Sequence, residues 1–197
     1  MKVTKYFYED DSTLRFLAWI KEYKGDEIVT GFVHGDTIYS VLLPSKFKPP
    51  AFIEARKIDE VVKDNHTVKL WKFTKYLQEL SVPGIQVIHG IVVRKKPEQI
   101  ISEANSVVRV LPEIFAVLTA AEKRICIATS FVDNITLGDF VELIVDAIEE
   151  DEDKTVLNLI FKGVITRKLS LDEALSVIKK SEFASLVRLS RALQEHQ

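Results

Sequence analysis

The sequence predicts an α+β fold, in which an N-terminal antiparallel β-meander packs with a helical C-terminal half. Two observations carry this prediction. The first 45 residues contain short β-branched and aromatic runs separated by glycine turns. After Pro97, apolar residues recur at three- and four-residue steps, the spacing of an amphipathic helix. We therefore expect a mainly β lobe, 1–96, and a mainly helical lobe, 97–197, either separate or merged into one compact domain.

Three or four strands are expected in the meander. Glycine marks two of the breaks, at Lys24-Gly25-Asp26 and His34-Gly35-Asp36, as in β-hairpins. Pro44 and Pro49-Pro50 end the sheet, because proline cannot donate a hydrogen bond to a neighbouring strand. The expected strands are Val3–Tyr8, Thr13–Tyr23, Glu27–Val33 and Thr37–Leu43.

Residues 51–82 fit two interpretations. Ala51–Val62 and Val68–Leu80 both have apolar residues at helical spacing, but the start of the second run alternates like a strand. Pro83-Gly84 predicts a turn. The following run, Ile85–Arg94, is almost continuously apolar and β-branched, which predicts a buried strand.

Beyond Pro97 the pattern predicts mainly helices, with one further strand at Ile125–Phe131. Pro112 is expected to kink the first helix or to begin a new one. Ser170-Leu171-Asp172-Glu173 is a capping box that opens a helix to Lys179. The other expected helices are 97–111, 112–121, a helix capped by Thr136 that runs to Ile148, Thr155–Ile165 and Glu182–Gln194.

Composition excludes several classes of protein. The chain has 197 residues, a net charge of −2, seven glycines and one cysteine, so collagen-like repeats, internal disulfides and cysteine-based zinc sites are excluded. No apolar run is long enough to cross a membrane, and the N-terminus lacks the apolar core of a signal peptide. We therefore expect a cytoplasmic protein without membrane contact.

The charge is unevenly distributed. Residues 1–97 contain 16 Lys/Arg and 12 Asp/Glu, whereas the remaining 100 residues contain 11 and 17. Surfaces of opposite sign suit docking to a partner or to a second copy better than bulk nucleic-acid binding, which usually shows a basic excess.

Catalytic signatures are missing from the sequence. We find no phosphate-binding loop, dinucleotide-binding glycine motif, serine nucleophile elbow or His-Glu-x-x-His zinc motif. Isolated glycines do not build a backbone cradle for phosphate. We therefore expect no cofactor, no metal and no catalytic residue, and an interaction module rather than an enzyme.

Two histidines offer the alternative. His34 and His89 each follow an apolar run and precede a glycine. If the two strand ends met, the imidazoles would form an acid–base pair, oriented by Asp36, of the kind that cleaves RNA without a metal. The plainer interpretation is turn chemistry, because glycine supplies positive φ after the strand.

A basic and aromatic strip is the candidate RNA contact. Lysines that neutralise phosphate alternate with rings that stack on bases, and a second basic cluster follows the buried strand. The alternative is an amphipathic element whose rings belong to the core. The strip comprises Lys69, Trp71, Lys72, Lys75, Tyr76, Arg94, Lys95 and Lys96.

An acidic face is the candidate partner contact. Asp139–Asp153 contains eight acids and neither lysine nor arginine. On the expected helix, one face would carry Asp139, Glu142, Asp146 and Glu149. A solvated surface is the plainer interpretation, with docking of a basic partner second; the spacing does not match a calcium-binding loop.

The layout as a whole resembles the small accessory subunit of crenarchaeal type III-B CRISPR (Cmr) RNA-targeting complexes. The likeness rests on the length, an aromatic N-terminal sheet with Tyr6-Phe7-Tyr8, Phe16 and Trp19, and a helical end. Few Asn, Gln and Met residues add a thermophile-like composition. The resemblance implies a homodimeric, non-catalytic antiviral subunit attached to a larger ribonucleoprotein in a thermophilic archaeon, with RNA as a further partner.

Overall fold

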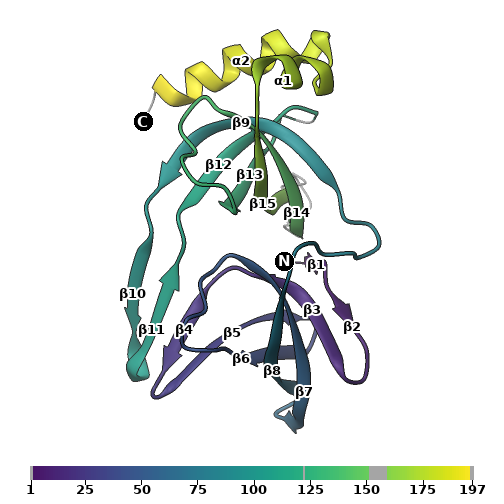
Figure 1. Cartoon of the computed structure of the whole chain (residues 1–197), viewed down its shortest axis with the longest axis vertical. Coiled ribbons are helices and arrows are strands. Elements are labelled where there is room, and N and C mark those ends of the chain that lie inside the picture. The colour runs from purple at the N-terminus through teal and green to yellow at the C-terminus, as the bar shows by residue number, and fades with distance from the viewer. Residues whose placement is uncertain (1, 122, 151–158, 196–197) are drawn as a thin grey trace. The chain divides into compact units, whose positions relative to one another are not determined.

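In the computed structural model, which describes residues 2–121, 123–150 and 159–195, the chain forms two compact units (Figure 1). The N-terminal unit comprises Val3–Gly84 and Glu98–Pro112. The C-terminal unit contains Ile85–Pro97 and the chain from Glu113 onward, together with Lys2. The two units therefore interleave along the sequence.

The N-terminal unit is a single curved β-sheet. Its strands, in chain order, are β2 (Tyr8–Glu9), β3 (Thr13–Ala18), β4 (Lys21–Lys24), β5 (Glu27–His34), β6 (Thr37–Leu42), β7 (Ala51–Lys63), β8 (His66–Leu77), β10 (Gln99–Glu103) and β11 (Val107–Leu111). A 3₁₀ turn, η1 (Ala104–Ser106), joins β10 to β11, and β1 (Lys2–Lys5) crosses the boundary between the units.

Strand pairing makes this sheet a Greek-key barrel. Hydrogen bonds link the strands in the order β10-β11-β4-β5-β6-β8-β7-β3-β2. Only Trp19 and Ile20 separate β3 from β4, so these two strands form one bent strand that joins both sides of the sheet. Counting β3–β4 as the first of five strands, the order is 1-2-3-5-4-1, with the third and fifth (β6 and β8) parallel.

The C-terminal unit repeats this order. Its barrel strands are β9 (Val87–Lys96), β12 (Ile114–Thr119), β13 (Ile125–Ser130), β14 (Phe140–Glu150) and β15 (Leu159–Leu169). They pair as β14-β15-β13-β12-β9, and β9 pairs back with β14, so the barrel is closed. The third and fifth strands, β13 and β15, are again parallel. Both units therefore have the strand order of the oligonucleotide/oligosaccharide-binding (OB) barrel.

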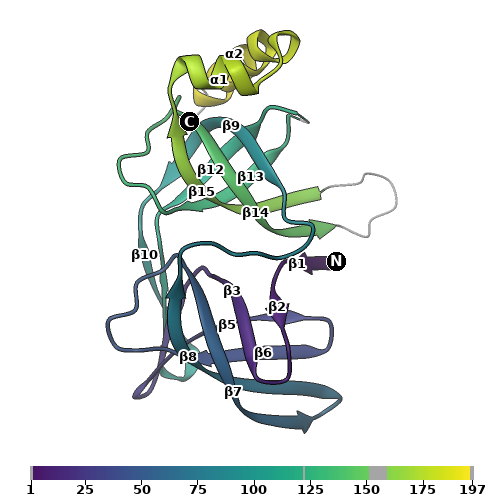
Figure 2. The same ribbon diagram turned by 45° about the vertical axis from the view of Figure 1, so that its right-hand side comes forward.

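Two helices complete the C-terminal unit, α1 (Leu171–Val177) and α2 (Lys180–Glu195). The apolar side of α2, with Leu186 buried and Phe183 and Val187 half-buried, packs against Ile91 and Val93 of β9 and Leu118 of β12. Figure 2 shows both helices on the outside of the barrel strands. The described helices are too short or too polar to span a membrane.

Aromatic side chains fill the N-terminal barrel. Trp71 and Phe16 are completely buried, and Tyr39 is nearly so. They alternate along β3, β6 and β8 with side chains that point outward, as expected for strands that have one face in a core. The side chain of Trp71 is therefore part of this core.

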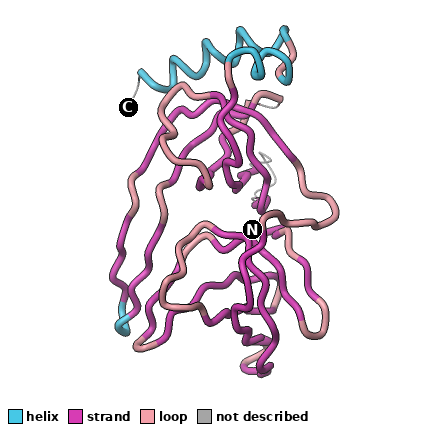
Figure 3. The backbone as a smooth tube through the Cα atoms, in the orientation of Figure 1, coloured by secondary structure: helices cyan, strands magenta, loops and turns pink. Residues whose placement is uncertain are grey.

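The predicted helical C-terminal half is wrong (Figure 3). Residues expected as helices at 97–121 form β10, β11 and β12, and the helix after Thr136 is β14. In β14 the fully buried residues Val141, Leu143 and Val145 alternate with period two, and a bulge at Asp146, between Val145 and Ala147, then breaks this alternation. In the expected helix Thr155–Ile165, residues 159–165 are strand β15 and 155–158 lie outside the described residues.

Most of the ambiguous stretch 51–82 forms a long β-hairpin, β7–β8, which ends at Leu77. Its two-residue turn, Asp64-Asn65, has positive φ at both positions, as in the primed turns that match strand twist. The strands at Ile85–Arg94 and Ile125–Phe131 are confirmed as β9 and β13. The capping box is confirmed too, because the Ser170 hydroxyl accepts from the Glu173 amide and the Glu173 carboxylate accepts from the Ser170 amide.

Gly31 of β5 provides a test of the N-terminal barrel. A Cβ at this position would lie 2.0 Å from the carbonyl oxygen of Tyr39 on β6, where only backbone could yield. We expect Gly31→Ala to lower the free energy of unfolding by about 3 kcal/mol, whereas Ser40→Ala, directly opposite, should change it by less than about 0.5 kcal/mol.

Tryptophan fluorescence during urea denaturation measures this change. Both tryptophans of the chain, Trp19 and Trp71, belong to the N-terminal unit, so the signal is specific for it. Equal unfolding midpoints for the two variants would contradict the close approach of β5 and β6.

Candidate nucleic-acid interface

Four basic side chains gather on the outer surface of β3, β7 and β8 in the N-terminal unit. We call this surface the basic face. It consists of Arg15, Arg56, Lys72 and Lys75, with Tyr8 at its margin and Glu54 near its centre.

The first row of the basic face contains a pair of like charges. Arg56 of β7 and Lys72 of β8 are directly opposite in the antiparallel ladder. Their chain neighbours Ala55 and Trp71 point into the core, so alternation places Arg56 and Lys72 outside, and both are exposed. Like charges directly opposite each other destabilise a sheet. Neither side chain has an ion pair among the described residues, so nothing in this part of the chain offsets the repulsion.

The second row is partly neutralised. Lys75, Glu54 and Arg15 are opposite one another on β8, β7 and β3, and Tyr8 follows Arg15 on β2. Arg15 Nε lies 3.0 Å from Glu54 Oε1, and Lys75 Nζ lies 3.9 Å from Glu54 Oε2. The side chains of Arg15 and Lys75 are 45% and 61% exposed, against 17% for Glu54. The cations are therefore the accessible groups.

A β-bulge brings Lys75 to this face. Lys72 and Lys75 are three residues apart, which in a regular strand would place them on opposite sides. The register shifts because Phe73 is opposite Ala55 while Lys75 is opposite Glu54, which leaves Thr74 as the extra residue. The bulge thus aligns Lys75 with Lys72.

An aromatic ring accompanies these charges. The guanidinium of Arg15 lies 5.3 Å from the centre of the Tyr8 ring, within cation–π range. The Tyr8 hydroxyl donates to Asp10 Oδ2 at 2.8 Å, and this hydrogen bond raises the pKa of Tyr8. The ring is 38% exposed, so one side of it remains open to a ligand.

The predicted basic and aromatic strip is divided by the fold. Lys72 and Lys75 belong to the basic face, but Trp71 is completely buried and cannot stack on a base. Lys69 is on the inner side of β8, where its ammonium lies 2.7 Å from Glu9 Oε2. Tyr76 is 52% exposed but stacks on Phe47 at 5.9 Å between ring centres.

The second cluster of the strip, Arg94, Lys95 and Lys96, is exposed on β9 of the C-terminal unit. Lys95 donates to the carbonyl oxygen of Ile135 at 3.1 Å and lies 3.5 Å from Glu113. Arg15, Arg56 and Tyr8 have no local signal in the sequence, because only the register of β2, β3, β7 and β8 brings them beside Lys72 and Lys75.

The two histidines have separate surroundings in the two units. His34, at the end of β5, is exposed and its ring lies 5.0 Å from that of Phe7. Asp36 accepts the Thr67 amide through its main-chain oxygen, and no hydrogen bond joins its carboxylate to His34 in the described residues. His89 Nε2 lies 2.9 Å from Glu142 Oε2. The acid–base pairing of His34 with His89 stays a prediction.

Glu142 joins His89 to the helical end of the C-terminal unit. Arg167 of β15 contacts both oxygens of Glu142, each at 3.2 Å, and also the Glu173 carboxylate of the α1 capping box. The hydrogen bonds from Arg167, and then the contact with His89, lower the pKa of Glu142. The cluster forms a structural bridge from the barrel to α1.

The expected acidic helix face does not exist, because Glu142, Asp146 and Glu149 belong to the strand β14. Asp146 is buried, and Glu149 forms a salt bridge with Lys162 of β15. Asp139, just before the strand, lies 3.3 Å from Lys168. Three of these four acids therefore neutralise cations of the same unit.

No His, Cys, Asp and Glu side chains cluster to hold a metal ion anywhere in the described ranges. Cys126 is buried in the C-terminal unit, and burial raises its thiol pKa to about 12, so it is a poor nucleophile.

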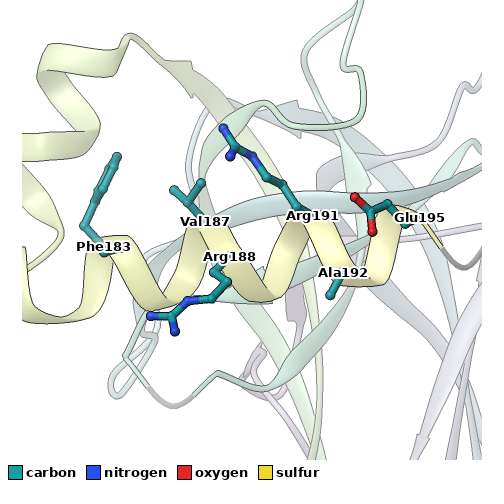
Figure 4. A pocket seen from close by; sticks show the side chains of 7 residues that line it. Phe183, Val187, Arg188, Arg191, Ala192 and Glu195 are labelled. Atoms are coloured by element: carbon teal, nitrogen blue, oxygen red, sulfur yellow. The ribbon is translucent and has the colours of Figure 1, made fainter.

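A hollow beside α2 is lined by one side of that helix (Figure 4). Phe183 and Val187 supply apolar surface, and Arg188 and Arg191 supply charge. These side chains come from a single helix and do not assemble a nucleophile with a base.

No family model matches the chain, and no curated protein matches it either. The resemblance to the Cmr accessory subunit is therefore a prediction that rests on the sequence layout alone.

Acid denaturation tests the role of Glu142. A lowered folded-state pKa contributes stability that is present above the ordinary pKa of a glutamate and is lost as the pH falls through the lowered value. We expect Glu142→Gln to reduce the dependence of stability on pH below about 4.3. Glu113→Gln, which removes a more exposed acid of the same unit, is the matched control. Thermal midpoints measured between pH 3 and 7 that change equally in both variants would contradict the bridge.

Proposed function

We propose that the chain is a non-catalytic accessory protein that binds single-stranded nucleic acid across the basic face. The observation that carries the proposal is the pair Arg56–Lys72. Two exposed cations directly opposite each other have a cost to stability, and an anionic ligand removes that cost. Arg15 and Lys75 extend the positive surface to a second row on the same side of the sheet.

The architecture supports a polynucleotide as this ligand. OB barrels bind oligonucleotides in many unrelated proteins, although a fold alone does not fix a function. Same-face residues of a strand are about 6.7 Å apart, so the two rows offer successive contacts along a flexible backbone. The accessible Tyr8 ring beside Arg15 adds a surface for base stacking.

The accessory role in this proposal follows the expectation from the sequence that the protein is an interaction module, which binds partners through its surface. An RNA-handling assembly of the Cmr kind is the setting that the resemblance implies. A metal-independent ribonuclease using His34 and His89 is the alternative, and it requires turnover of RNA by the purified protein.

Loss of the opposed cations is the direct test of nucleic-acid binding. We expect Arg56→Gln with Lys72→Gln to weaken binding of a single-stranded oligonucleotide roughly tenfold near 0.1 M salt. The slope of log affinity against log salt should fall by about 1.4, since each phosphate contact on a single strand contributes about 0.7. Fluorescence anisotropy with oligouridylate and oligothymidylate arms separates RNA from DNA binding.

The control for this test removes two lysines elsewhere in the same unit. Lys46→Gln with Lys63→Gln changes the net charge equally at exposed positions outside the basic face. An equal loss of affinity in both double variants would mean that charge alone governs binding, and the proposed interface would be rejected.

A separate surface favours the expected homodimer. On the outside of the N-terminal barrel, four apolar residues are opposite one another across β5, β6, β8 and β7: Val33, Ile38, Val68 and Val61. Val33, Ile38 and Val61 are 58%, 37% and 45% exposed. Such a row can form the apolar centre of an interface between two copies, in which the same patch serves both.

Light scattering tests the dimer. We expect a dimeric mass for the wild-type protein and a monomeric mass for Ile38→Lys, because a buried unpaired charge opposes association. Lys63→Gln, close to the row but without added charge in it, should remain dimeric. A monomeric wild-type protein at micromolar concentration would exclude this role for the row.

A further inference from the structure

A short N-terminal segment lies against the N-terminal barrel, with Phe7 packed on the barrel core. We call Tyr6–Glu9 the strap. Only Tyr8 and Glu9 of the strap pair with a neighbouring strand, opposite Arg15 and Leu14. Tyr8 points outward to the basic face, whereas Phe7 and Glu9 point toward the barrel and are half-buried.

Phe7 occupies an aromatic cradle. Its ring centre lies 5.0 Å from those of Phe32 and His34 and 5.3 Å from that of Tyr39. Phe32 is half-buried and His34 is exposed, so this cradle is at the barrel surface. Lys5 is also near, with its ammonium 5.3 Å from the centre of the Phe32 ring.

Glu9 occupies an anion site next to the cradle. The Tyr39 hydroxyl donates to Glu9 Oε1 at 2.6 Å, and Lys69 Nζ donates to Glu9 Oε2 at 2.7 Å. Burial, followed by the hydrogen bond to Glu9, raises the pKa of Tyr39, so its hydroxyl stays protonated as a donor. Two donors from β6 and β8 thus converge on one carboxylate.

We propose that the strap occupies a nucleotide-binding site, in which the Phe7 ring takes the place of a pyrimidine base and the Glu9 carboxylate takes the place of its phosphate. The inference relies on the proposed function only for the class of ligand. It uses residues outside the four cations of the basic face.

The chemistry of the site matches both parts of a nucleotide. Lys69 and Tyr39 supply an ammonium and a hydroxyl, both of which donate to phosphate oxygens as they do to a carboxylate. Aromatic rings can stack on any base, because every base has a flat π face. Phe7 and Glu9 are two residues apart on one side of the strap, about 6.7 Å, which is close to the reach from a base to its own phosphate.

The size of Phe7 selects the base. A single six-membered ring fills the cradle, so a pyrimidine enters with less rearrangement than a purine. The base of a free nucleotide, unlike the Phe7 ring, is not tied to the strap backbone. It can therefore also turn and stack on the exposed His34 ring. The strap therefore acts as a competitor that a nucleotide must displace.

A strap that is only structural and a strap that competes with a nucleotide predict different effects of Glu9→Gln on nucleotide binding. If the strap only closes the core, Glu9→Gln weakens the contacts with Lys69 and Tyr39 and lowers stability without any gain in binding. If the strap competes with a nucleotide, the same change frees Lys69 and tightens binding. The sign of the change in affinity separates the two roles.

Titration of the full chain with uridine 5′-monophosphate, followed by the His34 ring signals in NMR spectra, is the experiment. We expect Glu9→Gln to tighten binding roughly tenfold, the value of one hydrogen bond to a charged group. Lys69→Gln and Tyr39→Phe should weaken it. Glu27→Gln, an exposed acid of the same unit, changes the net charge equally and should leave affinity unchanged.

Two further nucleotides define the ligand, and a folding check shows whether any change in binding comes from misfolding. Thymidine monophosphate distinguishes a deoxyribose source, and guanosine monophosphate should bind more weakly than either pyrimidine. Tryptophan fluorescence checks that the variants are folded, and Phe7→Leu gives a second strap variant that should also tighten binding by removing the ring.

The outcomes keep this inference separate from the proposed function. If uridine monophosphate binds neither the wild-type protein nor Glu9→Gln, or if Glu9→Gln and Glu27→Gln have equal affinity, the strap is structural and the inference is overturned. Oligonucleotide binding that depends on Arg56 and Lys72 would still uphold the basic face. Loss of that binding, with the nucleotide titration intact, would reject the basic face alone.

Discussion

The parallel pairing of the third and fifth strands is the constraint on which each barrel depends. In the N-terminal unit β6 pairs with β8, and in the C-terminal unit β13 pairs with β15. A parallel pair cannot be joined by a tight turn, so the chain first forms the fourth strand and only then returns to pair the fifth strand with the third. This return places β7 between β8 and β3, and the basic face exists only because these three strands are neighbours.

The sequence predicts the short-range features of this fold well. Turn glycines place the meander β4–β5–β6, a continuous apolar run gives β9, and the capping box locates the start of α1. Each of these signals comes from residues close together in the chain. The Asp64-Asn65 turn is also local, but apolar spacing around Phe52 and Ile58 suggests a helix and hides it.

The long-range features could not be predicted in the same way. Bulges in β14 and β8 shift the apolar alternation, so a strand such as 140–150 has the spacing of a helix. The basic face depends on pairing between residues 16 to 39 positions apart, for which a single sequence carries no direct signal. Lys72 and Lys75 were predicted from their local pattern, whereas Arg15 and Arg56 required the register.

Along the sequence, the hairpin β10–β11 lies between the first two strands of the C-terminal barrel, but it belongs to the N-terminal unit, where β11 pairs with β4. During synthesis, β4 therefore emerges long before its partner and keeps an unpaired edge until residue 111 has left the ribosome. A nascent chain of about 90 residues would hold all five barrel strands of the N-terminal unit and still expose that edge to aggregation. Protection of this edge thus depends on a segment that follows β9, the first strand of the second barrel, so the first unit is completed only after synthesis of the second has begun.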